Sequence, residues 1–246
     1  MKHSRKVTVG YTLLGLLVAL SLFTAVEGQE GQVTLNPIHD TYTSTEAPES
    51  NYGDAPYLKV TITEAYTRFI WLKFNLSAVP DGAIITSANL ELYAMGVVHI
   101  FEPETYNVST HSCSDNSWSE ESMTRLNQPD YESRSTSWVL VETPEQWYSW
   151  DATKLVQRHV DVRGHGENET TIVLQENLNH RPAFNVIFSS KENENEQHFP
   201  KLTVQWSGIE PDLPEHPWAS VLLVTFLLLL ITPAIVITVY KRTHKH

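Results

Sequence analysis

Cysteine is almost absent from this chain, because Cys113 is the only one among its 246 residues. A single thiol excludes a disulfide within the chain, so an exported domain of this sequence has to be held together by its hydrophobic core. We expect the Cys113 side chain to be buried in that core. The alternative is an accessible thiol that forms a cross-link or carries a lipid.

Sequence signatures of catalysis are also missing. The chain contains no G-x-S-x-G, H-E-x-x-H or phosphate-loop pattern, and its 11 histidines show no zinc-type spacing. Glu120 and Glu121 are adjacent carboxylates, but a glycosidase pair is defined by its spacing across a cleft rather than along the chain. We therefore predict that the protein is not an enzyme and has no catalytic residues.

Basic side chains are scarce outside the two ends of the sequence. The whole chain carries 29 acidic and 17 basic residues, and residues 29–240 hold 28 of the acidic ones but only 11 of the basic ones. A surface with this excess of negative charge is soluble and repels other polyanions at long range. Nucleic acid is therefore excluded as an expected partner.

Two long uncharged apolar runs lie near the ends of the chain. The first, residues 7–26, follows a basic start and precedes a small residue, Gly28, at a candidate cleavage point. This order is typical of a secretory signal peptide, which we expect to span residues 1–28. A signal anchor that is not cleaved is the alternative.

The second apolar run lies within residues 218–240, carries no charge and is long enough to cross a bilayer as a helix. Trp218 and Tyr240 stand at its ends, where aromatic rings favour the headgroup layer. The short tail, residues 241–246, is basic and is therefore expected in the cytoplasm. The sequence thus predicts a single-pass type I protein of the cell membrane with an extracellular domain.

The region between the two runs, residues 29–208, consists of short β-type segments separated by turn residues, which favours an all-β sandwich or barrel. Leu90 and Leu92 alternate with Glu91, so the two faces of one expected strand differ in polarity. Residues 68–74 are apolar on both faces, as expected of a central strand. The expected strands are residues 33–35, 57–62, 68–74, 88–94, 97–101, 137–141, 171–175, 185–189 and 201–206.

One short helix is expected over residues 154–160, with Asp151 or Thr153 as its N-cap. Residues 112–145 are mostly polar with scattered aromatic side chains, and they form the longest irregular segment. Residues 209–217 are rich in proline and in acidic side chains, so we expect a short extended stalk that holds the domain close to the membrane.

The central region also contains a series of sequence blocks that follow one another in a recognisable order. The blocks are Asp40-Thr41-Tyr42, Asn51-Tyr52-Gly53, Leu58-Lys59-Val60, residues 68–77, 80–85 and 87–93, Trp118-Ser119-Glu120, Asn127-Gln128-Pro129, and residues 150–156, 188–192 and 200–204. Together they resemble the DNRLRE domain, which is also classed as carbohydrate-binding module family 96 and is related to archaeal disaggregatase-type surface proteins. The resemblance covers residues 33–206.

This resemblance implies a jelly-roll β-sandwich that binds or organises surface polysaccharide. The chain departs from the family pattern at Asn75, where aspartate is usual, and after Trp118, where a Thr-Trp pair is usual. The best-known members of the family bind alginate, which is an acidic polymer. Because the basic residues of this chain form no obvious cluster, we do not carry alginate over as the ligand.

Aromatic side chains in the irregular segment and at its borders are the candidate sugar contacts. Flat apolar rings pack against the C–H faces of sugars, and the loops of a rigid sandwich often carry function. Trp118 and Trp150 belong to the family blocks, and we expect them in the core instead. The candidates are Tyr131, Trp138, Trp147 and Tyr148, with Tyr131 and Trp147 ahead of the other two.

Oxygen-bearing side chains near the first turn are the candidate metal ligands. Calcium takes about six to eight oxygen ligands, and Asp40, Asn51 and Asp54 could supply some of them. Capping of the turn by the same side chains is the simpler interpretation. Apart from such a structural calcium ion, we expect no cofactor.

Three sequons, at Asn75, Asn107 and Asn168, are candidate acceptors of N-linked glycans on an exported chain. The motif is short and also occurs by chance. Asn168, which follows a glycine-rich turn, is the best of the three.

The leading functional hypothesis is a membrane-anchored carbohydrate-binding module at the cell surface, with polysaccharide or cell-envelope components as its partners. The alternative is a structural envelope or adhesion protein that packs laterally and binds no free sugar. A lyase or hydrolase is the third hypothesis, and it requires a groove lined by convergent acid and base groups. The six-residue tail is too short for a cytoplasmic effector domain.

Overall fold

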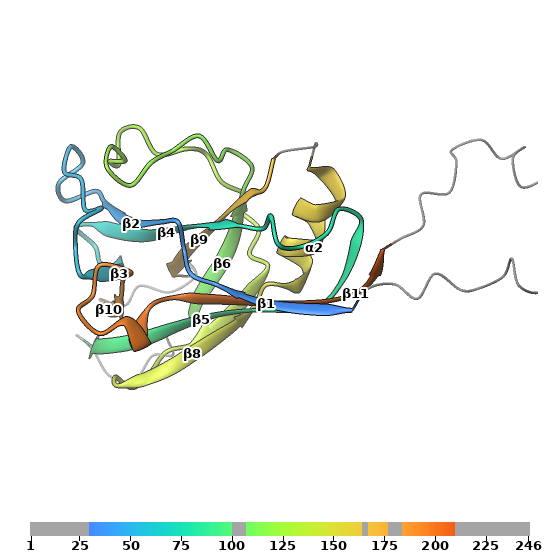
Figure 1. Cartoon of the computed structure of the whole chain (residues 1–246). Coiled ribbons are helices and arrows are strands. Elements are labelled where there is room, and N and C mark those ends of the chain that lie inside the picture. The colour runs from blue at the N-terminus through green and yellow to red at the C-terminus, as the bar shows by residue number, and fades with distance from the viewer. Residues whose placement is uncertain (1–29, 100–106, 164–166, 177–183, 210–246) are drawn as a thin grey trace, which may run out of the picture. The chain divides into compact units, whose positions relative to one another are not determined.

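The computed structural model describes four parts of the chain, residues 30–99, 107–163, 167–176 and 184–209 (Figure 1). The predicted signal peptide, the predicted membrane segment and the basic tail lie outside the described residues, as does the predicted stalk from residue 210 onward. Within the four described parts, no helix combines the length and the hydropathy needed to cross a membrane.

The described residues contain eleven strands, one α-helix and one 3-10 helix. The strands are β1 (Gly31–Leu35), β2 (His39–Ser44), β3 (Tyr57–Ile62), β4 (Thr67–Asn75), β5 (Ala83–His99), β6 (Asn107–Cys113), β7 (Ser137–Leu140), β8 (Gln146–Asp151), β9 (Glu169–Glu176), β10 (Phe184–Ser189) and β11 (Lys201–Ile209). The helices are α2 (Thr153–Val162) and η1 (Glu196–His198). All strands belong to one sheet with the order β1-β11-β5-β10-β3-β4-β9-β6-β7, in which β2 also pairs with β4 and β8 with β5.

The sheet is antiparallel and curls back on itself, so that its two halves face each other across one core. Figure 1 shows β1, β5, β8 and β11 in one layer and β2, β4 and β9 in the opposite layer. Side chains from both layers and from α2 form the main cluster of buried residues. Leu90 and Leu92 point into this core from β5, as their alternation with Glu91 predicts.

Trp150 lies in the main core and joins several strands. Its side chain is fully buried, and its ring packs edge-on against Phe188 of β10 with the centroids 5.8 Å apart. The indole Nε1–H donates to the carbonyl oxygen of Val108 in β6 at 2.7 Å. The expectation that Trp150 belongs to the core is therefore confirmed.

A second, smaller cluster covers the outer face of β4 and β9. Ile70 and Leu72 of β4 point into the main core, whereas Trp71 points into this second cluster, so β4 is apolar on both faces as predicted. The segment between β6 and β7 packs over the second cluster. The members of the second cluster are Phe69, Trp71, Cys113, Trp118, Met123 and Val173, with Tyr131 at its edge. Both Cys113 and Trp118 are thus buried, as expected.

The prediction of an all-β domain with one short helix is confirmed, but three strands were not predicted. These are β2, β6 and β8. Residues 88–94 and 97–99, expected in two separate strands, belong to one long strand, β5, while residues 100 and 101 of the second expected strand lie outside the described residues. Buried hydroxyl groups explain why β2 and β6 do not look like core strands; Thr43 Oγ1, for example, donates to Gln128 Oε1 at 2.7 Å.

The start of the helix α2 also differs from the prediction. Ala152 is its N-cap and offers no side-chain hydrogen bond, whereas the sequence predicts Asp151 or Thr153 at this position. The Asp151 side chain instead accepts a hydrogen bond from the Thr153 backbone N–H at 2.9 Å. Asp151 thus still bonds to the first turn, from one position earlier than a standard cap.

Candidate functional site

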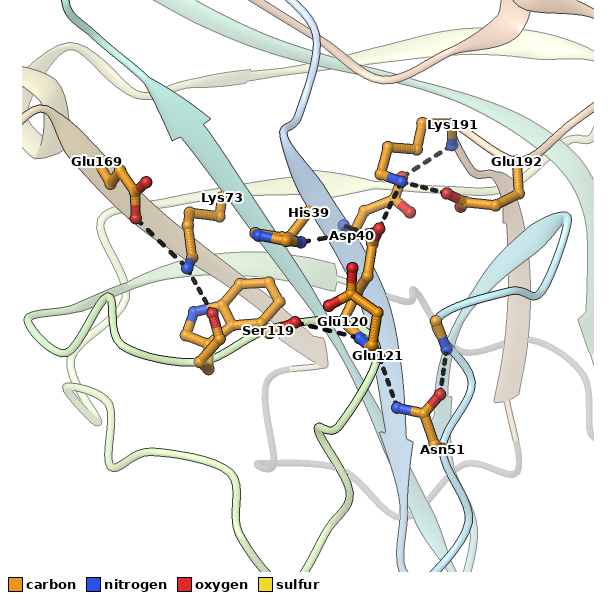
Figure 2. A network of polar contacts seen from close by, with 12 residues as sticks. His39, Asp40, Asn51, Lys73, Ser119, Glu120, Glu121, Glu169, Lys191 and Glu192 are labelled. Carbon is orange, nitrogen blue, oxygen red and sulfur yellow. Dashed lines mark hydrogen bonds and ion pairs between the residues drawn. The ribbon is translucent and has the colours of Figure 1, made fainter.

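A network of charged side chains lies where three distant segments of the chain meet (Figure 2). Strand β2 supplies His39 and Asp40, the segment between β6 and β7 supplies Glu120, and the loop after β10 supplies Lys191 and Glu192. We name these five residues the charged network. All three segments belong to the sequence blocks that carry the family resemblance.

Hydrogen bonds to Asp40 hold the three segments together. The Asp40 backbone N–H donates to Glu120 Oε2 at 2.8 Å, and the Lys191 backbone N–H donates to Asp40 Oδ2 at 2.9 Å. Asp40 is fully buried. Burial and the neighbouring Glu192 carboxylate raise the pKa of Asp40 well above its ordinary value, although the contact with Lys191 opposes this rise.

The Lys191 ammonium group lies between two carboxylates. Its Nζ is 2.7 Å from Glu120 Oε1 and also donates to Glu192 Oε1. Burial lowers the pKa of Lys191, but the hydrogen bonds to Glu120 and Glu192 outweigh burial, so the pKa rises above its ordinary value. Lys191 therefore stays positively charged, and its ammonium group bonds to both Glu120 and Glu192, whereas Asp40 accepts from the Lys191 backbone N–H.

Asn51 fixes the loop that carries Glu120. The Asn51 side-chain amide donates to the carbonyl oxygens of Glu120 at 2.6 Å and Met123 at 2.8 Å, and its Oδ1 accepts from the Gly53 backbone N–H at 3.1 Å. A Cβ atom at Gly53 would lie 2.3 Å from the Glu120 carbonyl oxygen. The close approach of these two loops therefore requires glycine at this position.

Lys73 of β4 holds the same loop from its other side (Figure 2). Lys73 Nζ donates to the carbonyl oxygen of Asn116 at 2.7 Å and to that of Trp118, and it lies 3.4 Å from Glu169 Oε2. Lys73 is buried, and its charge also lies 4.9 Å from the centroid of the Trp118 ring. The loop and its Glu120 are thus anchored on both sides.

The charged network is too enclosed to accept a polymer. Asp40 is fully buried, and the side chains of Glu120 and Glu192 are only 13% and 22% exposed. An enclosed group of carboxylates suits a cation rather than a sugar chain.

A second cluster lies on the outward face of β5, β8 and β11. Tyr93 of β5 pairs with Trp147 of β8, and their rings meet edge to face with centroids 5.6 Å apart. His198 of η1 stacks on Tyr93 at 3.7 Å, and Lys201 Nζ lies 4.1 Å from the centroid of the Trp147 ring. We name Tyr93, Trp147, His198 and Lys201 the aromatic platform.

Polar side chains continue from the aromatic platform along the same face of the sheet. Glu91 pairs with Ser149 of β8 and with Lys201 of β11, two residues from the Tyr93–Trp147 pair. Alternate residues of a strand share one face, so this row stands beside the rings. The next row consists of Asn89, Asp151 and Thr203. Carboxylate, amide and hydroxyl groups of this kind hydrogen-bond to sugar hydroxyls.

Two of the predicted sugar contacts, Trp147 and Tyr148, are neighbours in β8 but face opposite ways. Trp147 is half-buried within the aromatic platform. Tyr148 packs against the main core, and its hydroxyl donates to the Thr143 carbonyl oxygen at 2.9 Å. Alternation along the strand therefore separates the two rings.

The other two predicted contacts lie elsewhere in the fold. Tyr131 packs edge-on against Trp71 with centroids 5.7 Å apart, and its hydroxyl donates to Gln175 Oε1 at 2.7 Å. Trp138 is 61% exposed on β7. The structure therefore does not gather the four aromatic candidates into one surface, and their role as sugar contacts stays a prediction.

The predicted calcium ligands are also separated. Asp40 belongs to the charged network, whereas Asn51 already uses both its amide group and its Oδ1 within the protein. Asp54 is exposed in the turn before β3. The structure therefore does not bring Asp40, Asn51 and Asp54 together as one set of calcium ligands, and a calcium ion held by them stays a prediction.

The predicted glycan acceptors lie at the ends of strands. Asn75 is exposed at the end of β4, Asn107 is half-buried at the start of β6, and Asn168 is half-buried just before β9. Asn75 and Asn168 line one polar hollow of about 520 Å³ together with Asp115 and Ser117. Glycosylation at these sites stays a prediction.

Sequence reasoning did not single out most residues of the two clusters. For Tyr93 a signal was present, because its spacing from Glu91 places both on the polar face of one strand. His198 and Lys201 carry no local signal, since only the folded sheet brings them to Trp147. Glu120 and Glu192 stand in the family blocks, but nothing in the sequence brings them together.

Comparison with known proteins agrees with the resemblance found in the sequence. The family model of carbohydrate-binding module family 96 matches residues 31–206. A gellan lyase from Bacillus sp is 25% identical over 225 residues, which cover 87% of this chain but only 9% of that protein. The chain thus spans a small part of the length of this relative.

Proposed function

Because the chain belongs to carbohydrate-binding module family 96, we propose that its β-rich domain binds surface or extracellular polysaccharide and that the aromatic platform is the binding surface. The observation that supports this choice is the grouping of Tyr93, Trp147, His198 and Lys201 on one outward face of the sheet. The role is binding rather than catalysis, as the family of binding modules implies.

The platform offers the chemistry that sugar recognition needs. Its rings are held by the paired strands β5 and β8 and by the helix η1, so little conformational entropy is lost when a ligand binds. Apolar ring surface packs against sugar C–H groups, while Glu91 accepts from sugar hydroxyl groups and Lys201 donates to hydroxyl or carboxylate groups beside the rings. Lys201 also supplies a local positive charge on an otherwise acidic domain.

A direct binding experiment tests the proposal. The full-length chain, purified in detergent, is run through native gels that contain gellan, alginate or a neutral glucan. Gellan comes first because it is the polymer in the name of the relative. We expect at least one polymer to slow the migration of the chain. Unchanged migration in acidic and neutral polymers alike would remove the proposed function.

We also propose that the domain is a jelly-roll sandwich displayed outside the cell. Residues 1–28 are the signal peptide, residues 218–240 the single transmembrane helix of a type I protein, and residues 241–246 the cytoplasmic tail. The uncharged run between Trp218 and Tyr240 and the basic tail support this topology. Protease added to intact cells should then degrade residues 29–208. Degradation only after the cells are permeabilised would reverse the sidedness.

A structural role in the envelope is the second candidate function. It is supported by Trp138, which is 61% exposed on β7, a strand at the end of the sheet order. Exposed edge strands pair readily with other chains. Lateral association of the full-length chain that is lost in Trp138→Ala, combined with no polysaccharide binding, would favour this role.

A further inference from the structure

Three carboxylates of the charged network converge although they come from distant segments. One oxygen from each of Asp40, Glu120 and Glu192 lies within 4.8 Å of the others (Figure 2). Oxygen atoms that share a calcium ion at about 2.3–2.6 Å are separated by distances of this order. The geometry alone does not identify an ion, since acidic clusters occur without one.

Two buried oxygens in this cluster lack a hydrogen-bond partner. Asp40 is 0% exposed, its Oδ2 accepts from the Lys191 backbone N–H, and its Oδ1 has no partner among the described residues. The Oε2 atom of Glu192 is buried and has no partner within the same parts of the chain. A buried carboxylate oxygen without a donor costs considerable free energy, so something must satisfy these atoms.

The charges around these oxygens do not balance within the protein. Lys191 donates to Glu120 and Glu192, and within the described residues it is the one ammonium group that faces the three carboxylates. The His39 ring lies beside Glu120, with Nδ1 3.7 Å from Oε1. With all three carboxylates ionised, these carboxylates and Lys191 together carry two net negative charges. A proton shared between Asp40 and Glu192 would satisfy both free oxygens but would neutralise only one of these charges, whereas a divalent cation neutralises both and satisfies both oxygens.

We propose that Asp40, Glu120 and Glu192 bind one calcium ion, with the free oxygens Asp40 Oδ1 and Glu192 Oε2 as its principal ligands. The three protein ligands are oxygens, which suits calcium better than zinc. Calcium also tolerates irregular geometry and gives up water more readily than magnesium does. The proposal keeps Asp40 from the set predicted from sequence and replaces Asn51 and Asp54.

The ion adds a further link between three segments that the hydrogen bonds of Asp40 and Lys191 already join. It connects β2, the loop that carries Glu120 and the loop after β10. That last loop leads into η1, whose His198 belongs to the aromatic platform. Calcium therefore stabilises the domain and fixes the approach to the platform, but its binding does not depend on polysaccharide.

Thermal unfolding of the full-length chain in detergent tests the site. The chain is freed of divalent ions with EDTA, dialysed and titrated with CaCl2. With calcium about a hundredfold above its Kd, the Tm is expected to rise by roughly 5–10 °C. Asp40→Asn and Glu192→Gln should abolish this rise. Because Asp40 is deeply buried, the more exposed Glu192 provides a second variant with less risk to folding.

Matched variants separate this site from the alternatives. Glu194→Gln removes an exposed carboxylate from the same loop and should keep the full rise in Tm. An unchanged Tm in CaCl2, or a rise that survives both Asp40→Asn and Glu192→Gln, overturns the proposal. Loss of the rise in Asp54→Asn but not in Asp40→Asn also overturns it. An equal rise in MgCl2 overturns the assignment to calcium.

Discussion

Replacing Trp147 by alanine is expected to weaken polysaccharide binding by about 10- to 70-fold. Trp147 is half-buried, with Tyr93 at its edge and Lys201 over its ring. If a sugar covers about 60–100 Å² of the remaining ring surface, roughly 25 cal/mol per Å² gives about 1.5–2.5 kcal/mol. That free energy corresponds to about one to two powers of ten in Kd.

The assay is affinity electrophoresis over a series of polymer concentrations, which gives Kd values for wild type and variants. Trp138→Ala removes an exposed tryptophan from β7 and is expected to change Kd by less than about twofold, while Trp147→Phe keeps part of the ring contact and should give an intermediate value. The Tm of each variant shows whether it is folded. Wild-type affinity in a folded Trp147→Ala, or a larger loss in Trp138→Ala, would refute the assignment of the platform.

Three further predictions concern stability. Gly53→Ala should lower the free energy of unfolding in urea by about 1–3 kcal/mol, because its Cβ would lie 2.3 Å from the Glu120 carbonyl oxygen. Gly96→Ala, whose Cβ would lie 3.5 Å from its nearest atom, should lower it much less. Equal decreases in the two variants would contradict the packing account. Trp150→Phe removes the 2.7 Å hydrogen bond from the indole Nε1–H to the buried Val108 carbonyl oxygen and should lower the free energy of unfolding by about 2–4 kcal/mol in the same assay. A decrease below about 1 kcal/mol would contradict the role of this hydrogen bond. Burial lowers the pKa of His111 below its ordinary 6.5, so the unfolded chain takes up a proton that the folded chain resists, and stability should fall as the pH drops below about 6.5. His111→Gln should flatten this dependence between pH 7 and 5, and an unchanged slope would count against it.

Burial sets the direction of that pH effect, and the hydrogen bond to the Glu132 carbonyl oxygen opposes it. His111 Nδ1 lies 2.9 Å from the Glu132 carbonyl oxygen and must donate to it, which leaves Nε2 as an acceptor. Nε2 lies 3.0 Å from Gln175 Nε2, which is a donor because the Oε1 atom of Gln175 accepts from Tyr131. A proton on His111 Nε2 would face the Gln175 amide donor and would have to be accepted by Ser109 Oγ, 2.9 Å away.

Strands with alternating or continuous apolar residues could be predicted from the sequence. Residues 57–62 were predicted with the observed bounds of β3, and the two-faced pattern of 68–74 correctly indicated a central strand between two clusters. Strands β2 and β6 could not be recognised in this way, because buried threonine, serine and histidine side chains satisfy one another only after the sheet has formed. From the sequence alone, the polar segments that form β2 and β6 cannot be told apart from exposed loops.

The candidate sites likewise contain some residues that could be predicted from the sequence and others that could not. Sequence reasoning chose Trp147 and Asp40, which lie in the aromatic platform and the charged network respectively. It could not find His198 or Glu192, because their partners are contributed by segments on other strands. Asn51, another predicted metal ligand, uses its amide to hold the Glu120 loop, a contact that only the folded structure reveals. Pairings between distant segments are set by the fold and leave little trace in local pattern.

A crystal structure of the chain with a bound oligosaccharide tests the central claim most directly. The oligosaccharide is cut from the polymer that binds best in the gel assay. We predict a sugar ring within about 4 Å of the Trp147 side chain, with its hydroxyl groups near Glu91 or Lys201. An oligosaccharide seated against Trp138, or in the hollow between Asn75 and Asn168, would contradict the account.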